Sequence, residues 1–244
     1  MPYHRFVTPS TDDLRTAMIA AAERQLITST DNDIATRAVC DAVGVTQPVL
    51  YRLFGDKRGL LDALADQGLE RYADMKAAEE RTADPVADLK AGWDQHMDFA
   101  RRNPALYQLM FVPRPWSRSI ARERVLDLLK AALVRCAAAG ALTMEPGVAA
   151  QLILSANVGV ALNQIAQPDL FDDPALADRM RDSVFGHVLT ESTTPDPDLP
   201  LRAAALRLRS QLGLSGTQAL EREEAALLDL WLQRVISKQD PQAV

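Results

Sequence analysis

The side chains with the most distinctive chemistry lie between Gln47 and Arg52, in the sequence QPVLYR. Glutamine and arginine can make paired hydrogen bonds to adenine and guanine, and proline and valine can contact the methyl group of thymine. The spacing of the neighbouring apolar residues leaves Gln47, Pro48, Val49, Tyr51 and Arg52 available to face outward. The chemistry that this stretch suits is therefore noncovalent recognition of double-stranded DNA.

Two short helices joined by a glycine turn must hold these side chains. Val39 and Val43 are four residues apart, so they share one face of the first helix. Gly44 follows, where a helix commonly ends in a left-handed residue that costs glycine least. Thr46 is a suitable N-cap for the second helix. The apolar face of that helix consists of Leu50, Leu53 and Phe54. This pattern is typical of a helix-turn-helix, whose second helix enters the DNA major groove.

The rest of the chain also favours helices. Alanine and leucine are frequent and β-branched runs are scarce, which is typical of an all-α protein. Ser10 or Thr11 can cap a first helix that runs to about Ile27, and Asp56 can cap a longer one that runs to about Ala78. Further helical patterns cover residues 89–100, 104–111, 125–136, 146–167, 174–189, 201–213 and 216–237. The run at 193–200, rich in Pro, Asp and Thr, is expected to be a linker, and Ser215 with Gln218 is expected to form a capping box for the last helix.

The stretch from Ile34 to Ala65 resembles the DNA-binding segment of the tetracycline-repressor (TetR) family of transcription regulators. The resemblance rests on the Thr-Arg opening of the first helix, Gly-Val at the turn, Gln-Pro and Leu-Tyr in the second helix, and the Lys and Leu-Leu that follow. The segment NPALYQLMF, at residues 103–111, is similar to part of some effector domains of this family. The resemblance implies an all-α fold with an N-terminal three-helix DNA-binding domain and a larger C-terminal helical domain for effector binding and dimerisation.

The resemblance also implies a division of roles among the DNA-binding residues. The positions that match phosphate contacts are Thr36, Thr46, Tyr51 and Lys57. The positions that match base-edge contacts are Arg37, Gln47, Pro48 and Val49. Arg52 could reach either a base or a phosphate.

A second set of residues suits either a ligand pocket or a plain core. Small-molecule pockets are mostly apolar with a few polar anchors. The aromatic and methionine residues that fit such a lining are Trp93, Met97, Tyr107, Met110, Phe111 and Trp116. Asn157 interrupts an apolar helix, and a buried amide needs hydrogen-bond partners, which a ligand, a dimer partner or a neighbouring backbone could supply. Of these, the ligand is the assignment for Asn157, which we expect to face the pocket. A strip of small residues nearby would let another helix approach closely and favours a dimer interface: Ala156, Gly159 and Val160.

Charge and motif content narrow the function classes. The net charge is −6, and the first sixty residues hold seven Lys/Arg and seven Asp/Glu, so few phosphate contacts are expected. The motifs of dinucleotide-binding, ATP-binding, zinc-protease and serine-hydrolase sites are absent from the sequence. Cys40, Cys136 and the histidines lack metal-ligand spacing, and the cysteines are expected to be buried thiols. We therefore expect no enzyme, metal, cofactor or membrane span.

The sequence predicts a cytoplasmic, homodimeric transcriptional regulator, with repression as the family's usual outcome. It would bind a palindromic operator and be released by a small, largely apolar effector. Residues 1–56 would bind DNA, residues 57–192 would bind the effector and dimerise, and residues 193–244 would form a linker and a C-terminal helical extension. Two alternatives remain open. One is a helical small-molecule-binding protein without sequence-specific DNA binding, and the other is an α-helical enzyme that uses the C-terminal pocket.

Overall fold

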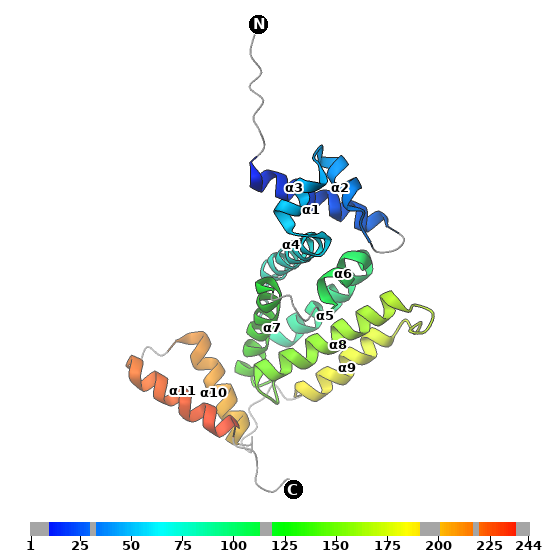
Figure 1. The fold of residues 1–244 in the computed structure, drawn as a ribbon. Helices are drawn as coiled ribbons and strands as arrows, with labels where there is room; N and C mark the ends of the chain where they lie inside the picture. Colours follow the sequence, from blue (N-terminus) through cyan, green and yellow to red (C-terminus); the bar gives the residue numbers. More distant parts are fainter. Residues whose placement is uncertain (1–9, 30–32, 113–118, 191–200, 217–219, 238–244) are drawn as a thin grey trace. The chain divides into compact units, whose positions relative to one another are not determined.

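The computed structural model describes residues 10–29, 33–112, 119–190, 201–216 and 220–237. Within these ranges the chain forms eleven α-helices and no strand, with one isolated bridge between Leu142 and Leu189 (Figure 1). The expected all-α fold is confirmed. The helices are α1 (Thr11–Thr28), α2 (Thr36–Val43), α3 (Gln47–Phe54), α4 (Lys57–Ala77), α5 (Pro85–Arg102), α6 (Pro104–Phe111), α7 (Ile120–Ala138), α8 (Pro146–Ala166), α9 (Leu176–Val188), α10 (Leu201–Ser215) and α11 (Arg222–Ser237).

Most helix starts follow the local signals in the sequence. Ser10 and Asp13 form a capping box at α1, in which the Asp13 N–H donates to Ser10 Oγ at 3.1 Å and the Ser10 N–H donates to Asp13 Oδ2 at 3.1 Å. Asp56 accepts a 2.8 Å hydrogen bond from the Gly59 N–H at the start of α4, as expected. Side-chain oxygens thus satisfy N–H groups that the first turn of a helix leaves without partners.

The start of the last helix differs from the sequence prediction. Ser215 does not cap it, because α10 continues to Ser215 and ends at Gly216, whose φ is 74°. The last helix, α11, begins at Arg222 and not at residue 216. Glu224 Oε2 accepts a 3.0 Å hydrogen bond from the Glu221 N–H at this start. Gln218, the other half of the expected capping box, and the expected linker at 193–200 lie outside the described residues.

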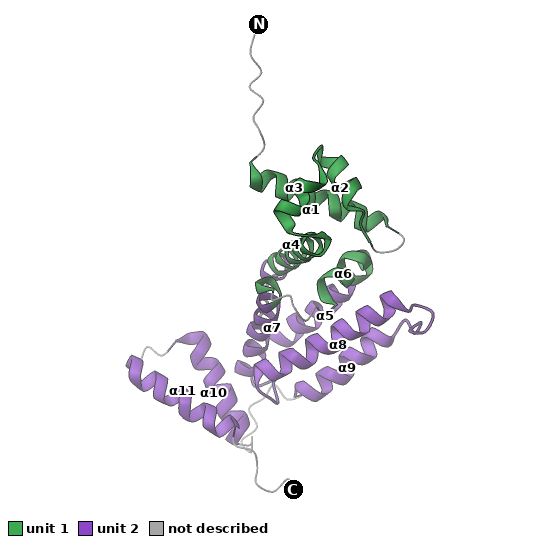
Figure 2. Ribbon diagram, in the orientation of Figure 1, with its two compact units in different colours: residues 1–74, 100–122 green, residues 75–99, 123–244 purple. Residues whose placement is uncertain are grey.

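The chain divides into two compact units, coloured separately in Figure 2. Unit 1 consists of residues 1–74 and 100–122. Its core contains the fully buried side chains of Met18, Leu26, Leu50 and Leu64, and α1 packs against both α2 and α6. Helices α4 and α6 approach closely at Gly68, where a Cβ atom would lie 3.0 Å from Met110 Sδ. These contacts hold the helix-turn-helix on one continuous core.

Unit 2 consists of residues 75–99 and 123–244. Helices α8 and α9 pack side by side, and α10 and α11 form a helical hairpin (Figure 1). The chain that leaves α7 pairs with the end of α9, since the Thr143 N–H donates to Val188 O and the Thr190 N–H donates to Ala141 O, both at 3.0 Å. Gln211 Nε2 in α10 donates to Ala138 O at the end of α7 at 3.0 Å.

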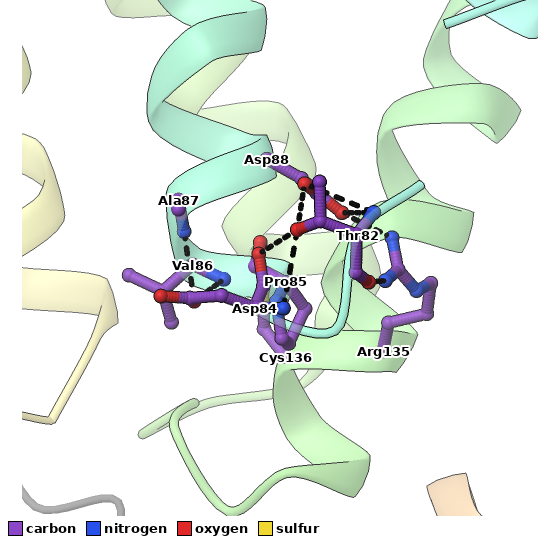
Figure 3. A network of polar contacts seen from close by, with 8 residues as sticks. All are labelled: Thr82, Asp84, Pro85, Val86, Ala87, Asp88, Arg135 and Cys136. Carbon is purple, nitrogen blue, oxygen red and sulfur yellow. Dashed lines mark hydrogen bonds and ion pairs between the residues drawn. The ribbon is translucent and has the colours of Figure 1, made fainter. Parts of the chain in front are cut away.

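A polar network in unit 2 ties the segment before α5 to α7 (Figure 3). Asp88 accepts a 2.6 Å hydrogen bond from Thr82 Oγ1 and a 2.8 Å hydrogen bond from Arg135 Nη1. Arg135 Nη2 also donates to Thr82 O at 2.6 Å. The Thr82 hydroxyl and the Arg135 guanidinium hold the pKa of Asp88 below its ordinary value. The neighbouring Cys136 is a buried free thiol, and so is Cys40, as expected from the sequence.

Candidate nucleic-acid interface

The turn between α2 and α3 is set by Gly44. Its φ of 75° and ψ of 33° are left-handed, and the Val45 N–H donates to Cys40 O at 3.0 Å to close the helix end. A Cβ atom at Gly44 would meet no atom within 4 Å. The demand for glycine is therefore conformational and not steric, because other residues lose about 1–2 kcal/mol in this region.

The inner face of α3 is held in place by buried apolar side chains and by contacts with α1. Leu50 is fully buried, and Phe54 is 9% exposed. Arg15 of α1 lies over the Phe54 ring, with its guanidinium carbon 4.6 Å from the ring centroid, and its Nη1 donates to Leu53 O at 3.0 Å. No local pattern predicts this contact, since it joins residues 38 positions apart. With this face fixed to α1, the opposite face of α3 is held toward solvent.

That outer face carries the side chains that the sequence singled out. Pro48, Tyr51 and Arg52 are exposed, and Gln47 and Val49 are half-buried. Tyr51 is 46% exposed, which is high for a residue of its apolar area. The residues of α2 and the turn that were predicted to contact DNA are also at the surface: Thr36, Arg37 and Thr46. The predicted reading face is thus available for contact with another molecule.

Two hydroxyl groups near the turn behave differently. Thr36 Oγ1 accepts a hydrogen bond from Gln47 Nε2 at 3.4 Å, which links the first residues of α2 and α3. Thr46 occupies the N-cap position of α3, but its side chain makes no capping hydrogen bond. Thr46 is therefore the N-cap residue of α3, as expected, but its side chain does not make the expected capping contact. Its hydroxyl is left exposed beside the first turn of α3, where backbone N–H groups favour an anion.

Lys57, predicted to contact a phosphate, has a partner in this structure. Its Nζ lies 2.6 Å from Asp33 Oδ2. Asp33 Oδ1 also accepts a 2.8 Å hydrogen bond from the Ile34 N–H. The hydrogen bond from Lys57, with that from Ile34, holds the pKa of Asp33 below its ordinary value. Asp33 is a functional candidate that sequence reasoning missed, because periodicity does not pair residues 24 positions apart.

Three of the predicted ligand-binding residues lie in unit 1 and are packed against other side chains. Tyr107, Met110 and Phe111 are buried in α6. The Phe111 ring meets Tyr72 edge-on at 5.9 Å and lies 4.5 Å from Tyr107, measured between ring centroids. Burial raises the pKa of Tyr107, so its hydroxyl stays protonated. These contacts favour a core role for the three side chains.

The other described members of that set lie in unit 2. Trp93 and Met97 are buried in α5, and Asn157 is buried in α8. The ring of Trp93 meets Phe185 of α9 edge-on, with centroids 5.9 Å apart. Among the described residues, neither Trp93 Nε1 nor Asn157 Oδ1 has a hydrogen-bond partner, although both atoms are buried. Trp116, the last of the predicted set, lies outside the described residues.

A buried histidine adjoins this part of α5. His96 is 5% exposed, and burial together with the charge of Lys76 lowers its pKa to about 3. Lys76 donates to Gly92 O at 2.9 Å and to Gln95 Oε1 at 3.2 Å, and burial lowers its own pKa. His96 is therefore neutral near pH 7. No cluster of three or more His, Cys, Asp or Glu side chains able to hold a metal occurs among the described residues.

One face of α8 is apolar and uncovered. The helix has a mean hydropathy of 1.4 over its most apolar segment and is, by length and composition alone, long and apolar enough to cross a membrane; 33% of that segment is buried inside the protein. Val148 and Leu152, four residues apart, are 51% and 40% exposed. Of the strip expected to form a dimer interface, Ala156 and Gly159 are half-buried. Val160 is instead buried in unit 2, because it lies on the face of α8 that packs inward.

Two family models match the chain. Residues 18–64 match the model described as bacterial regulatory proteins, tetR family. Residues 89–214 match the model described as tetracyclin repressor-like, C-terminal domain. No curated protein matches the sequence. Together the two models cover the helix-turn-helix and most of the helices that follow it, and α11 begins after the second match ends.

Several solved structures share the fold at low sequence identity. A protein of unknown function from Rhodococcus sp. is 22% identical, with a TM-score of 0.60 over 77% of this chain and 100% of that one. SmeT, the repressor of the Stenotrophomonas maltophilia multidrug efflux pump SmeDEF, is 20% identical, with a TM-score of 0.53 over 78% of this chain and 97% of that one. A complex of SmeT with triclosan matches with 18% identity and a TM-score of 0.50, over 77% of this chain and 97% of that one.

Proposed function

Because this chain belongs to the TetR family of DNA-binding transcription regulators, we propose that it acts in the cytoplasm as a homodimeric repressor. In this proposal it binds a palindromic operator and leaves it when a small, largely apolar molecule binds. The observation that carries the DNA-binding part is the outer face of α3, where Pro48, Tyr51 and Arg52 are exposed on a helix whose inner face is anchored to α1.

The residues of this face divide into two kinds of contact. Gln47 and Arg37 carry side chains that can bond base edges, and Pro48 and Val49 can contact a thymine methyl group. Tyr51, like Thr36, Thr46 and Lys57, is assigned to phosphates, and Arg52 to either kind of contact. Phosphate contacts position a protein on DNA, whereas base contacts specify the sequence.

Dimerisation through α8 would place two copies of α3 on one operator. A two-fold pair of recognition helices spaced about 34–36 Å apart enters successive major grooves, which explains why operators are palindromic. The uncovered apolar face of α8 around Val148 and Leu152 supports this interface, since apolar patches on a soluble surface commonly mark contact sites. Gly159 supports it too, because a Cβ atom there would meet nothing within 4 Å, leaving room for a second helix.

The effector would bind in unit 2 beside Trp93 and Asn157. A buried donor and a buried acceptor without partners each cost about 1–3 kcal/mol, a cost that a ligand can remove by supplying the missing hydrogen bonds. Such a ligand would offer an acceptor to Trp93 Nε1 and a donor to Asn157 Oδ1, with apolar groups against Met97. The SmeT complex with triclosan supports the idea that this fold can take up such a compound.

Release would follow from a shift between two populated forms. The operator would favour the form whose recognition helices match the groove spacing, and the effector would favour another form. The coupling between the two sites must be reciprocal and is typically about 1–3 kcal/mol, or about 5–150-fold in affinity.

Operator selection from random duplexes, followed by fluorescence anisotropy on the selected duplex, tests the DNA-binding part. Tyr51→Ala and Lys57→Ala should each weaken binding to every duplex and reduce the slope of log K against log salt by about 0.9 for each phosphate that the variant no longer binds. Arg24→Ala, which removes an exposed charge from α1, is the matched control and should leave the slope unchanged. Failure to enrich any sequence would contradict the proposal.

Native mass spectrometry of the purified protein can identify a bound effector. Asn157→Leu should retain operator binding and lose most of the response to that effector. It should also raise the free energy of unfolding, because it replaces a buried amide whose Oδ1 lacks a partner with an apolar group of similar size. A variant that responds normally to the effector would remove Asn157 from the proposed site.

A further inference from the structure

The last helix, α11, has a second apolar face that its own unit does not cover. Its inner face packs on α10, and Ile236 is buried there. Asp229 Oδ1 forms an ion pair with Arg209 Nε of α10 at 2.7 Å. On the other side Leu227, Leu230 and Trp231 are 44%, 41% and 54% exposed. These positions are three and four residues apart, so they form one stripe along the helix. A helix in a two-helix hairpin needs only one apolar face, which packs on its partner helix. The second apolar face of α11 is therefore available for another contact.

Charges of opposite sign flank this stripe. Glu224 lies three residues before Leu227, and Arg234 lies three residues after Trp231, and both are exposed. The pair Leu227 and Trp231 and the pair Glu224 and Arg234 are both centred on residue 229. If a second α11 lies antiparallel, the register that sets Leu227 against Trp231 of a second copy also sets Glu224 against Arg234 of that copy. A parallel pairing would set like charges against each other, which is destabilising.

We propose that α11 pairs antiparallel with α11 of a second copy of this chain, through the stripe of Leu227, Leu230 and Trp231. The contact is isologous, so each flanking ion pair occurs twice. It lies outside the residues that the family models match, and it is separate from the dimer interface proposed for α8. It therefore joins the two subunits of one dimer a second time or links one dimer to another.

Cysteine cross-linking of the full chain tests the pairing. In the antiparallel register, residue 230 of each copy lies one residue from the two-fold axis, a separation of about 3 Å along the helices. Leu230→Cys should therefore form an intermolecular disulfide under mild oxidation, read on a non-reducing gel. Gln233→Cys, exposed but about 120° away around the helix from the centre of the stripe, is the matched control and should remain largely monomeric on that gel. The native cysteines are buried, and the unsubstituted chain reports their background.

Charge reversal in the Leu230→Cys background tests the register. Glu224→Arg and Arg234→Glu should each slow cross-linking by about tenfold, because two-fold symmetry converts both ion pairs to like-charge pairs. The double variant, with both charges exchanged, should recover most of the rate. Glu224 also caps α11, but the double variant lacks that cap too, so recovery cannot come from capping. Equal cross-linking at residues 230 and 233, or no recovery in the double variant, would overturn the proposal, and operator binding measured separately would still test the proposed function.

Discussion

Replacing Asp33 by Asn should strengthen operator binding. The carboxylate holds Lys57 Nζ at 2.6 Å, and this ion pair must open before Lys57 can contact a phosphate. Asparagine keeps an oxygen that can accept the hydrogen bond of 2.8 Å from the Ile34 N–H, so the backbone at the start of α2 should stay in place. The substitution thus removes the competing charge with little other change.

The size of the gain follows from the exposure of the pair. The Lys57 and Asp33 side chains are 38% and 59% exposed, so solvent screens their attraction. Exposed ion pairs contribute about 0.2–1 kcal/mol, which corresponds to about 1.4-fold to fivefold in an equilibrium constant. A dimer opens two such pairs on one operator, so its affinity should rise about twofold to thirtyfold.

Fluorescence anisotropy on the selected operator at 0.1 M salt measures this change. Asp41→Asn is the matched control, since it removes an equal, exposed charge from α2 without touching Lys57. Combining Asp33→Asn with Lys57→Ala should abolish the gain, because the pair is then already broken. A loss of affinity in Asp33→Asn would refute the reasoning and make Asp33 a residue that aims Lys57 at the DNA. A gain that persists without Lys57, or that Asp41→Asn matches, would also refute it.

Three further predictions concern the turn, the reading face and unit 2. Gly44→Ala should lower the free energy of unfolding by about 1 kcal/mol, measured by urea denaturation, since only the left-handed φ of 75° opposes the new side chain; an unchanged midpoint would mean that the turn relaxes. Gln47→Ala should change the consensus obtained by operator selection at one position of each half-site, and an identical consensus would exclude base reading by Gln47. Arg135→Gln should destabilise the protein at neutral pH, by an amount that shrinks as the pH falls. The Thr82 hydroxyl and then Arg135 lower the pKa of Asp88, so its contribution is present above its ordinary pKa of about 3.9 and is lost as the carboxylate becomes protonated below that value. The difference in the free energy of unfolding between the variant and the unsubstituted protein should therefore be smaller at pH 3 than at pH 7. An equal difference at the two pH values would show that Arg135 acts independently of the charge of Asp88.

Local signals were sufficient to predict most of the helices. Asn103 and Pro104 separate α5 from α6, and Gly44 ends α2, because each residue constrains its own backbone whatever packs around it. The exception is the start of α11. The Ser215 to Gln218 pattern has the chemistry of a capping box, but α10 extends through Ser215 to the left-handed Gly216, so a competing local signal, the glycine C-cap, prevailed.

The reading face of α3 was also predictable, whereas the partners of its residues were not. Apolar periodicity shows which side of a helix is buried and leaves Tyr51 and Arg52 outside, as observed. It does not show that Asp33 forms an ion pair with Lys57 or that the Arg15 guanidinium lies over the Phe54 ring. Such pairs join helices or loops far apart in sequence, and their geometry depends on how the elements pack.

By itself the sequence determined the helical fold, the glycine turn and the outward residues of the helix-turn-helix. These features follow from backbone preferences and from the 3.6-residue period, which act over a few residues. Only the tertiary structure decided which apolar residues are core, as Val160 is, and which buried polar atoms lack partners, as in Trp93 and Asn157. Burial and hydrogen bonding are properties of a position within the packed molecule, and a one-dimensional pattern does not contain the neighbours that create them.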